Sequence, residues 1–284
     1  MSKALPQKAK PFIKYAGGKS KLASLIISHM PASFDNYYEN FCGGGAVFFA
    51  LATEPTRRYK RAVLSDINPQ LMNTYQMVRD QPLALIACLK SLSPYTGDAA
   101  FYNKYRRQEI FNDPLQEAAR VIYLNKSCFN GMLRVNSKGE SNVPHGGVAR
   151  AGKLNQTLYE TIKACSVVLQ GVELRTGSFE DTTRDIRVGQ SCVMCDPPYI
   201  PLSKTASFTA FAGEFGDTDQ AKLAQWCRIN RSQGVFIIAS NHDCLYARSL
   251  YEGFDLHEVQ VQRNISAKAS SRVQVGELII VGKP

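Results

Sequence analysis

The 284-residue sequence contains no long hydrophobic run. Its longest apolar stretches, such as residues 234–239, fall far short of the about 20 residues that a membrane-spanning helix needs. No apolar segment follows the basic residues of positions 1–14, so we expect no secretory signal and a cytoplasmic location. Internal repeats and low-complexity tracts are absent as well, which leaves an ordinary globular protein as the expected class.

Disulfide bonds are not expected, although the sequence has eight cysteines, because the chain is long and carries no secretory signal. The one close pair, Cys192 and Cys195, invites interpretation as a metal or redox pair. These residues lie in a strand-like apolar run, where side chains three apart point to opposite faces and cannot bind one ion together. We therefore expect core cysteines and no metal site.

The composition is that of a protein with a sizeable core and a basic surface. It is 44% hydrophobic and 20% charged, and 34 Lys and Arg against 24 Asp and Glu give a formal charge of +10. Such a surplus attracts polyanions, so nucleic acid is the first partner to consider. Net charge alone identifies no binding site.

Short apolar runs and helical patterns alternate along much of the chain, which predicts a parallel α/β sheet. The strand candidates are residues 36–41, 62–66, 172–177, 191–195 and 235–240. The helix candidates are residues 19–30, 46–53, 68–79 and 218–231. Asn68 followed by Pro69 is a typical helix start, Thr218 is a candidate cap, and Gly234 is a candidate stop.

The alternation is interrupted between residues 81 and 170, and it ends before the last two strand candidates. Residues 98–111 and 115–125 are helical in pattern, and residues 129–147 are polar and contain glycine. Residues 256–261 and 276–281 have no helix between them and predict an antiparallel edge. We expect a Rossmann-like, mostly parallel sheet formed by residues 1–80 and 171–284, with a helical domain of residues 81–170 inserted into it.

A glycine-rich turn follows the first strand candidate and predicts a nucleotide-like ligand at the sheet edge. It comprises residues 39–45, with Glu39, Phe41 and Gly43 among them, and the next strand ends at Asp66, whose carboxylate suits ribose hydroxyls. The sequence does not match the full dinucleotide fingerprint of NAD enzymes, because Phe48 stands where that motif has its third glycine. A phosphate-binding P-loop at residues 17–20 lacks its first glycine, because residue 13 is Ile.

Asp196-Pro197-Pro198-Tyr199 directly follows a strand candidate and predicts the catalytic site. The exocyclic amine of adenine is a poor nucleophile, since its lone pair is delocalised into the ring. Asp196 and the carbonyl of Pro197 can accept its two hydrogens, and Tyr199 can stack on the base. A sulfonium methyl donor is already a strong electrophile, so no covalent enzyme intermediate is required. Methylation of cytosine C5 would require a cysteine nucleophile, and the chain has no Pro-Cys dipeptide.

Together these motifs resemble the Dam-type (alpha group) DNA adenine-N6 methyltransferases over nearly the whole chain. The matching segments are residues 14–19, the Gly43 turn, residues 66–68, residues 130–144, residues 196–199 and residues 240–243. The resemblance implies a methyltransferase fold in a bacterial or phage-encoded protein. It also implies S-adenosyl-L-methionine as cofactor, with direct transfer of its methyl group to a flipped adenine of double-stranded DNA, within GATC.

The family's functional residues can be carried over position by position. Cofactor contacts fall on Tyr15, Lys19, Asp66, Ser178, Phe179 and Asp196. DNA contacts fall on Lys14, Phe129, Asn130, Met132, Arg134 and Pro144. Tyr15 stands where the family more often has Trp, and Phe129 and Met132 replace the more usual Tyr and Leu, which keeps the apolar bulk needed for intercalation. From its chemistry, Arg134 could also pair with guanine, and Asn130-Gly131 is typical of a hairpin turn.

Several interpretations remain open at this point. Residues 203–216 could close over the base or form a plain crossover, and residues 265–273 could bind phosphates or form a solvated loop. His242 is expected to be structural rather than an acid–base group. The rival functions are methylation of cytosine N4 or RNA adenine, and a DNA-binding regulator with an inactive site. We expect a monomer that binds double-stranded DNA, with no membrane contact and no obligatory protein partner.

Overall fold

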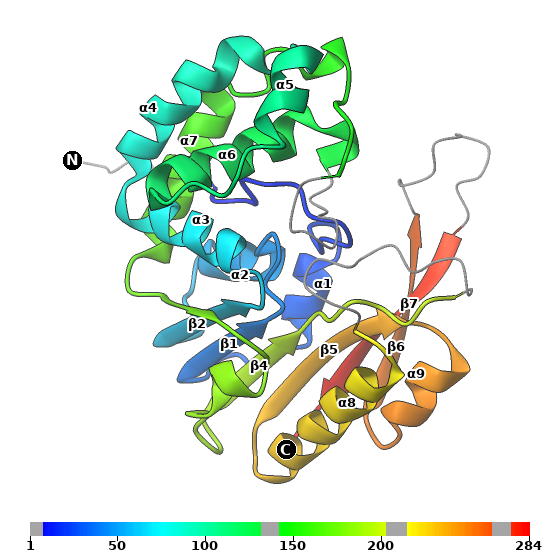
Figure 1. Cartoon of the computed structure of the whole chain (residues 1–284). Helices are drawn as coiled ribbons and strands as arrows, with labels where there is room; N and C mark the ends of the chain where they lie inside the picture. The colour runs from blue at the N-terminus through cyan, green and yellow to red at the C-terminus, as the bar shows by residue number, and fades with distance from the viewer. Residues whose placement is uncertain (1–7, 132–141, 203–214, 263–273) are drawn as a thin grey trace.

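The protein forms a seven-stranded sheet with helices on both faces (Figure 1). The computed structural model describes residues 8–131, 142–202, 215–262 and 274–284. The strands are β1 (Asn36–Asn40), β2 (Arg61–Asp66), β3 (Glu173–Thr176), β4 (Ser191–Cys195), β5 (Phe236–His242), β6 (Asp255–Gln262) and β7 (Gln274–Gly282). Their order across the sheet is β3-β2-β1-β4-β5-β7-β6.

The strand pairing confirms the expected α/β class. β1 lies between β2 and β4 and is parallel to both, and β3 and β5 extend the parallel sheet on either side. β7 inserts antiparallel between β5 and β6, so the antiparallel edge is also confirmed. The chain builds outward from β1 on one side and then returns to add β4 on the other. The carboxyl ends of β1 and β4 therefore flank a topological switch point, where open α/β sheets bind ligands.

Helices cover both faces because successive strand residues point to opposite sides. One buried cluster contains Tyr37 and Cys192 and packs against α1 (Ala23–Ser28), α2 (Ala46–Ala52) and α3 (Pro69–Asp80). The other contains Tyr38 and Cys195 and packs against α8 (Asp217–Ser232) and α9 (Leu245–Leu250). The two cysteines thus lie on opposite faces, as the sequence predicts.

Helix boundaries follow local capping, with differences at three of the expected helices, one of which, expected over residues 98–111, is helical only over Ala99–Tyr105. The Asn68 side chain accepts hydrogen bonds from the backbone of Gln70 and Leu71, so this start is confirmed. Thr218 is not a cap: α8 begins at Asp217 after Gly216, whose N–H donates to the Asp219 side chain. α1 is shorter than the predicted 19–30, because residues 16–22 form turns that bring Lys19 toward the sheet.

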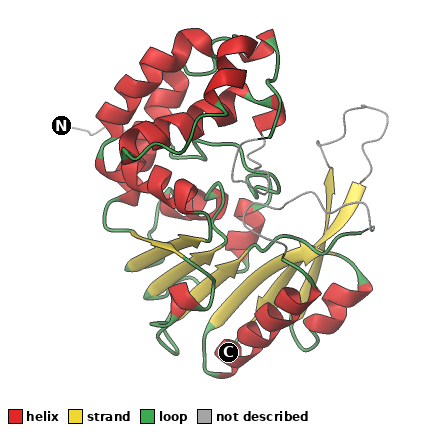
Figure 2. Ribbon diagram, in the orientation of Figure 1, coloured by secondary structure: helices red, strands yellow, loops and turns green. Residues whose placement is uncertain are grey.

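The stretch between α3 and β3 is mostly helical, and its helices gather at the top of Figure 2. Its longer elements are α4 (Pro82–Leu92), α5 (Ala99–Tyr105), α6 (Pro114–Ser127) and α7 (Gln156–Leu169). α6 contacts α3 and α4, and α7 contacts α2, α3 and α4, so this group also packs on the sheet-covering helices. Within the described ranges, no helix is both long and apolar enough to cross a bilayer.

Candidate active site

Asp196 follows β4 directly and lies at the centre of a charged cluster. Its Oδ1 lies 2.9 Å from the ammonium of Lys19 and accepts a 2.6 Å hydrogen bond from the hydroxyl of Ser240, at the β5 end. No group in the described part of the chain forms a hydrogen bond or ion pair with Oδ2. One carboxylate oxygen is therefore held by the protein, and the other can accept a hydrogen from a bound amine.

Lys19 is buried, with 5% of its side chain exposed. Besides Asp196, its ammonium donates a 2.6 Å hydrogen bond to the carbonyl of Gly17 and lies 4.5 Å from the ring centre of Tyr199. A buried cation needs such partners because burial removes its hydration. The resemblance implied a cofactor contact for Lys19; in the structure its ammonium pairs with the carboxylate of Asp196.

The turn after Asp196 is held by a network of side-chain amides. Gln220 donates to the carbonyl of Pro198 at 2.7 Å, and Asn241 accepts from the backbone N–H of Ile200 at 3.0 Å. Asn241 also donates to Gln220 at 3.0 Å, which links the two contacts. No described residue hydrogen-bonds the carbonyl of Pro197, so that oxygen remains available as a second acceptor. The prolines and these amides together fix its direction.

Tyr199 completes the turn. Its hydroxyl donates to Glu277 of β7 at 3.1 Å, and its ring meets that of His242 edge to face at 4.8 Å. Burial and the nearby carboxylates of Asp196 and Glu277 raise the pKa of Tyr199 well above its usual 10, so its hydroxyl stays protonated. His242 Nδ1 lies 2.5 Å from the carbonyl of Ile200, a contact that suits the expected structural role.

The glycine turn after β1 lies beside Asp66, as expected for a ligand cradle. Gly43 has φ +48° and donates to Asp66 at 3.1 Å, while the Asn68 backbone donates to the other oxygen at 3.0 Å. A Cβ added at Gly43 would lie 2.9 Å from the Tyr15 ring, so only glycine lets that ring approach the turn. Burial raises the pKa of Asp66, and these backbone hydrogen bonds oppose the rise.

The other residues predicted for the cofactor lie around this turn. Phe41 and Phe179 have ring centres 5.8 Å apart, and Ser178 donates to Asp181 at 2.8 Å beside Phe179. Glu39 is buried beneath the turn, where the hydroxyl of Tyr37 donates to it at 2.6 Å. Burial raises the pKa of Glu39 to about 8. The partners of Glu39 in the structure are protein groups, the hydroxyl of Tyr37 and the backbone of Phe48.

The parallel sheet brings the cradle and the catalytic turn together. β1, β2 and β4 are neighbours in register, so Asn40, Asp66 and Asp196 follow or end strands at one edge. Burial raises the pKa of Tyr15 well above its usual value, and the negative charges of Asp66 and Asp196 raise it further. The ring of Tyr15 therefore lies near both halves of the site.

Four of the six predicted DNA contacts also lie together. The Asn125 side chain, in α6, accepts from the backbone of Lys14 at 2.9 Å and donates to the carbonyls of Lys14 and Gly131 at 2.8 Å each. The N–H of Phe129 donates to the carbonyl of Pro144 at 2.8 Å, next to a bridge between Cys128 and His145. Phe129–Gly131 is a short 3-10 helix, so the tight Asn-Gly hairpin turn that the sequence predicts is not formed. Residues 128–129 and 144–145 instead form the two sides of a wider hairpin.

The exposed end of this hairpin carries the predicted wedge. Phe129 is 43% exposed, and Asn130 adopts φ +55° in the turn. Lys126, one helical turn away, is half-buried, and burial lowers its pKa to about 8. Met132 and Arg134 lie outside the described residues, as do residues 203–214, which are most of the loop expected over 203–216, and residues 263–273, which contain the loop expected over 265–273.

No individual role was predicted from the sequence for several residues of the site, although Ser240 and Asn241 belong to the matching segment 240–243. Ser240, Asn241, Gln220 and Glu277 support the catalytic turn, and Asn125 joins the hairpin to the N-terminal segment. Ser240 and Asn241 carried a signal, since they are polar residues at the end of an apolar strand. Nothing in the local sequence marks Gln220 or Glu277, because only the fold brings them to the turn.

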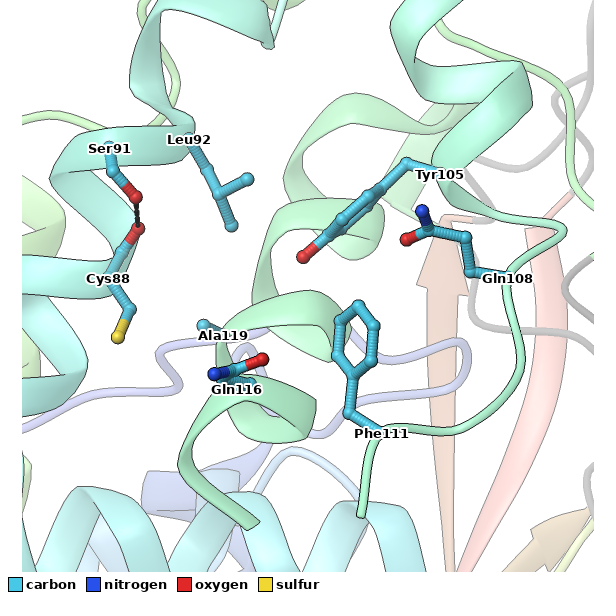
Figure 3. A pocket seen from close by; sticks show the side chains of 8 residues that line it. All are labelled: Cys88, Ser91, Leu92, Tyr105, Gln108, Phe111, Gln116 and Ala119. Atoms are coloured by element: carbon cyan, nitrogen blue, oxygen red, sulfur yellow. Dashed lines mark hydrogen bonds between the residues drawn. The ribbon is translucent and has the colours of Figure 1, made fainter. Parts of the chain in front are cut away.

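Two further observations concern metal binding and cavities in the described residues. They contain no group of three His, Cys, Asp or Glu side chains arranged to hold a metal ion. A cavity of about 390 Å³ lies between α4, α5 and α6 (Figure 3). It is lined by Cys88, Ser91, Leu92, Tyr105, Gln108, Phe111, Gln116 and Ala119. None of the residues predicted for catalysis, cofactor or DNA lines it.

Comparison with known proteins agrees with this geometry. Residues 15–265 match the model of the D12 class N6 adenine-specific DNA methyltransferases. The chain is 34% identical to the type II methyltransferase M1.LlaDCHI of Lactococcus lactis, over 95% of this chain and 94% of that protein. It is 35% identical to the DNA adenine methylase of Vibrio cholerae and 34% identical to that of Haemophilus influenzae, over 98% and 96% of this chain and 98% and 94% of those proteins.

The fold and site define an α/β enzyme with a carboxylate and a glycine turn at one switch point. On the similarity reported above, the chain belongs to the D12 class of N6 adenine-specific DNA methyltransferases.

Proposed function

We propose that this adenine-specific DNA methyltransferase transfers a methyl group from S-adenosyl-L-methionine directly to N6 of a flipped adenine, within GATC in double-stranded DNA. The observation that carries the proposal is the state of the catalytic turn. Asp196 Oδ1 is engaged by Lys19 and Ser240, while Oδ2 and the carbonyl of Pro197 have no partner among the described groups.

These two oxygens match the two hydrogens of an exocyclic amine. When both hydrogens are accepted, the nitrogen lone pair is drawn out of conjugation with the ring and becomes available for attack. Tyr199 offers a ring against which the base can be held. The proton released after transfer can leave to water, so no separate base is required.

The residues around Gly43 fit the proposed cofactor. The turn combines a glycine that admits close approach, a carboxylate at Asp66 for ribose hydroxyls, and the aromatic rings of Phe41, Phe179 and Tyr15. S-adenosyl-L-methionine would supply a methyl group already activated on a sulfonium. The protein's contribution is to orient that group toward the amine at Asp196 and to exclude water.

DNA would approach the hairpin that contains Phe129. Adenine N6 is buried in the duplex stack, so the base must leave it before it can reach Asp196. The exposed ring of Phe129 is placed to wedge into the stack, and Lys14 and Asn130 lie beside it. The formal charge of +10 favours binding to phosphates. In this proposal, residues 81–170 form the target-recognition domain, residues 1–80 and 171–284 form the catalytic domain, and the enzyme acts as a monomer in the cytoplasm.

A single labelling experiment tests the reaction. The protein is incubated with duplex DNA and S-adenosyl-L-methionine carrying a labelled methyl group, and the nucleosides are analysed by mass spectrometry. Label in N6-methyladenine is the expected result. Label in N4-methylcytosine, label only when RNA replaces DNA, or no label at all would each contradict the proposal and favour one of its rivals.

The target sequence needs its own test. Plasmid DNA from cells that lack other adenine methylation is treated with the enzyme and then digested with a pair of nucleases, one that cuts only methylated GATC and one that cuts only unmethylated GATC. We expect complete conversion between the two patterns. An unchanged pattern with N6-methyladenine present would exclude GATC while leaving adenine methylation intact.

A further inference from the structure

We propose that Glu277, on the antiparallel edge of the sheet, is a positioning residue that acts through the hydroxyl of Tyr199 to orient the ring that holds the target adenine. The inference rests on the proposed role of Tyr199 in base binding. The observation that carries it is the 3.1 Å hydrogen bond from the Tyr199 hydroxyl to Glu277 Oε2, which joins the catalytic turn to a strand near the end of the chain.

The register of β7 places Glu277 at the site. Glu277 pairs with His242 across the antiparallel β5–β7 ladder, and the N–H of Asp243 donates to the carbonyl of Gly276 at 2.9 Å. A Cβ at Gly276 would lie 3.0 Å from the Asp243 side chain, so glycine lets the strands meet closely here. Because strand residues alternate, Glu277 shares a face with Ile279, which lies in the buried cluster on the α1 side. That is the side from which Lys19 reaches Asp196.

Three contacts around the Tyr199 ring have different characters. His242 meets it edge to face at 4.8 Å, and the Lys19 ammonium lies 4.5 Å from its centre. Both contacts tolerate sliding of the ring, since aromatic and cation–π contacts are only loosely directional. The hydrogen bond to Glu277 is directional and fixes the far end of the side chain from the β7 side, opposite the charge of Asp196 and beside Ser240, which also interacts with Tyr199. It therefore determines how the ring is presented to a base.

Glu277 does not share the role of Asp196. Asp196 lies among groups that hold one oxygen and leave the other for the amine, whereas Glu277 contacts the turn after Asp196 through the hydroxyl of Tyr199. Loss of Glu277 should therefore affect the rate only while the Tyr199 hydroxyl is present. A purely structural link between β7 and the turn would instead lower stability without this dependence.

A double-mutant cycle separates these possibilities. The variants are Tyr199→Phe, Glu277→Ala and the double substitution, together with Glu277→Gln, which keeps an acceptor oxygen. Glu258→Ala on β6 is the matched control, because it removes an exposed carboxylate from the same antiparallel edge. Single-turnover rates of adenine methylation, KM for DNA, KM for the methyl donor and thermal unfolding midpoints are measured for each.

We expect Glu277→Ala and Tyr199→Phe each to lower the single-turnover rate by about tenfold, the effect of losing one hydrogen bond to a charged group. The double variant should be no slower than Tyr199→Phe, since both substitutions remove the same interaction. Glu277→Gln should recover most of the rate, KM for the methyl donor should not change, and Glu258→Ala should match the wild type. Multiplicative losses in the double variant, a wild-type rate for Glu277→Ala, or equal losses for Glu277→Gln and Glu277→Ala would each overturn the proposal.

A spectroscopic readout keeps this inference separable from the reaction itself. With 3-fluorotyrosine at position 199, the fluorine resonance should move in Glu277→Ala and stay in place in Glu258→Ala. An unmoved resonance in Glu277→Ala would overturn the contact even if the enzyme is active. If the resonance moves in Glu277→Ala but the wild-type protein does not methylate adenine, the proposed function is contradicted and the contact is still established.

Discussion

The ammonium of Lys19 and the carboxylate of Asp196 form an ion pair at 2.9 Å, although the two residues lie far apart in the sequence. Lys19 is 5% exposed and Asp196 is 21% exposed. The pair fixes one carboxylate oxygen and counters the negative charge of a site that must also hold Asp66 nearby. The ion pair joins Lys19 to the turn after Asp196. The resemblance implied a cofactor contact for Lys19 and did not predict this pair.

Substitution of Asp196 by Asn should remove activity without unfolding the protein. The amide keeps an oxygen that can accept from Ser240 and Lys19, but it replaces an ionised acceptor with a weaker one. We expect the rate of methyl transfer to fall by about 100-fold or more. Activity is measured by incorporation of labelled methyl groups, and circular dichroism checks the fold. A folded variant with a rate within tenfold of wild type would refute the role of Asp196.

Removal of the Lys19 charge should cost stability in a way that depends on Asp196. Lys19→Met leaves the carboxylate without its ion-pair partner, which should lower the free energy of unfolding by about 1–3 kcal/mol, less than for a fully buried pair because Asp196 is partly exposed. Urea denaturation measures the loss. In an Asp196→Asn background the same substitution should cost less. Equal losses in both backgrounds would show that the pair does not stabilise the fold.

Glu39 should make the stability of the protein depend on pH. In the unfolded chain its carboxyl ionises near its ordinary pKa of 4.5, whereas burial raises the folded pKa to about 8. Between these values the folded state holds a proton that the unfolded state has lost, so the contribution of Glu39 to stability falls as pH rises and levels off above about pH 8.

Glu39→Gln removes this titration and keeps an acceptor for the hydroxyl of Tyr37. The unfolding free energy of the variant relative to wild type should therefore increase from about pH 5 to pH 8, by at most about 1.4 kcal/mol per pH unit. Urea denaturation at several pH values measures the difference. A difference that stays constant across this range would mean that Glu39 is ionised in the folded protein.

Phe129→Ala should impair DNA distortion more than folding. Its side chain is 43% exposed, so truncation removes little core packing. We expect weaker binding of a duplex and a reduced fluorescence increase from 2-aminopurine placed at the target adenine, because the wedge that fills the stack is lost. Ile110→Ala, which shortens another exposed apolar side chain in the stretch between β2 and β3, is the control. Equal behaviour of the two variants would contradict the wedge role.

Most of the sheet could be predicted because its strands are short apolar runs bounded by turn residues. The run at 191–195 matches β4 at both ends, and the antiparallel edge follows from the missing helix between the last two runs. The boundaries of α1 and α8 could not be predicted, because tertiary contacts of Lys19 and the backbone N–H of Gly216 determine where those helices begin. A local pattern carries neither piece of information.

The chemistry of the site divides in the same way. Asp196 and Gly43 were recognisable because each belongs to a contiguous motif whose residues act together. Gln220 and Glu277 were not, because each contacts the catalytic turn from an element that is distant in sequence. Residue types that support a site from another strand or helix leave no spacing to detect.

The pairing of β1 with β4 has a consequence for how the protein is made. Asn36 leaves the ribosome long before its partner Ser191, because the helices between them must be synthesised before Ser191. Until β4 arrives, the nascent chain carries a sheet edge on β1 with unpaired backbone groups, a state open to aggregation. Synthesis must also reach Ser240 and then β7 before the catalytic turn has its supports. The turn after Asp196 therefore has all of these supports only once β7 has been synthesised, and a chain that stalls before β7 should lack the contact from Tyr199 to Glu277.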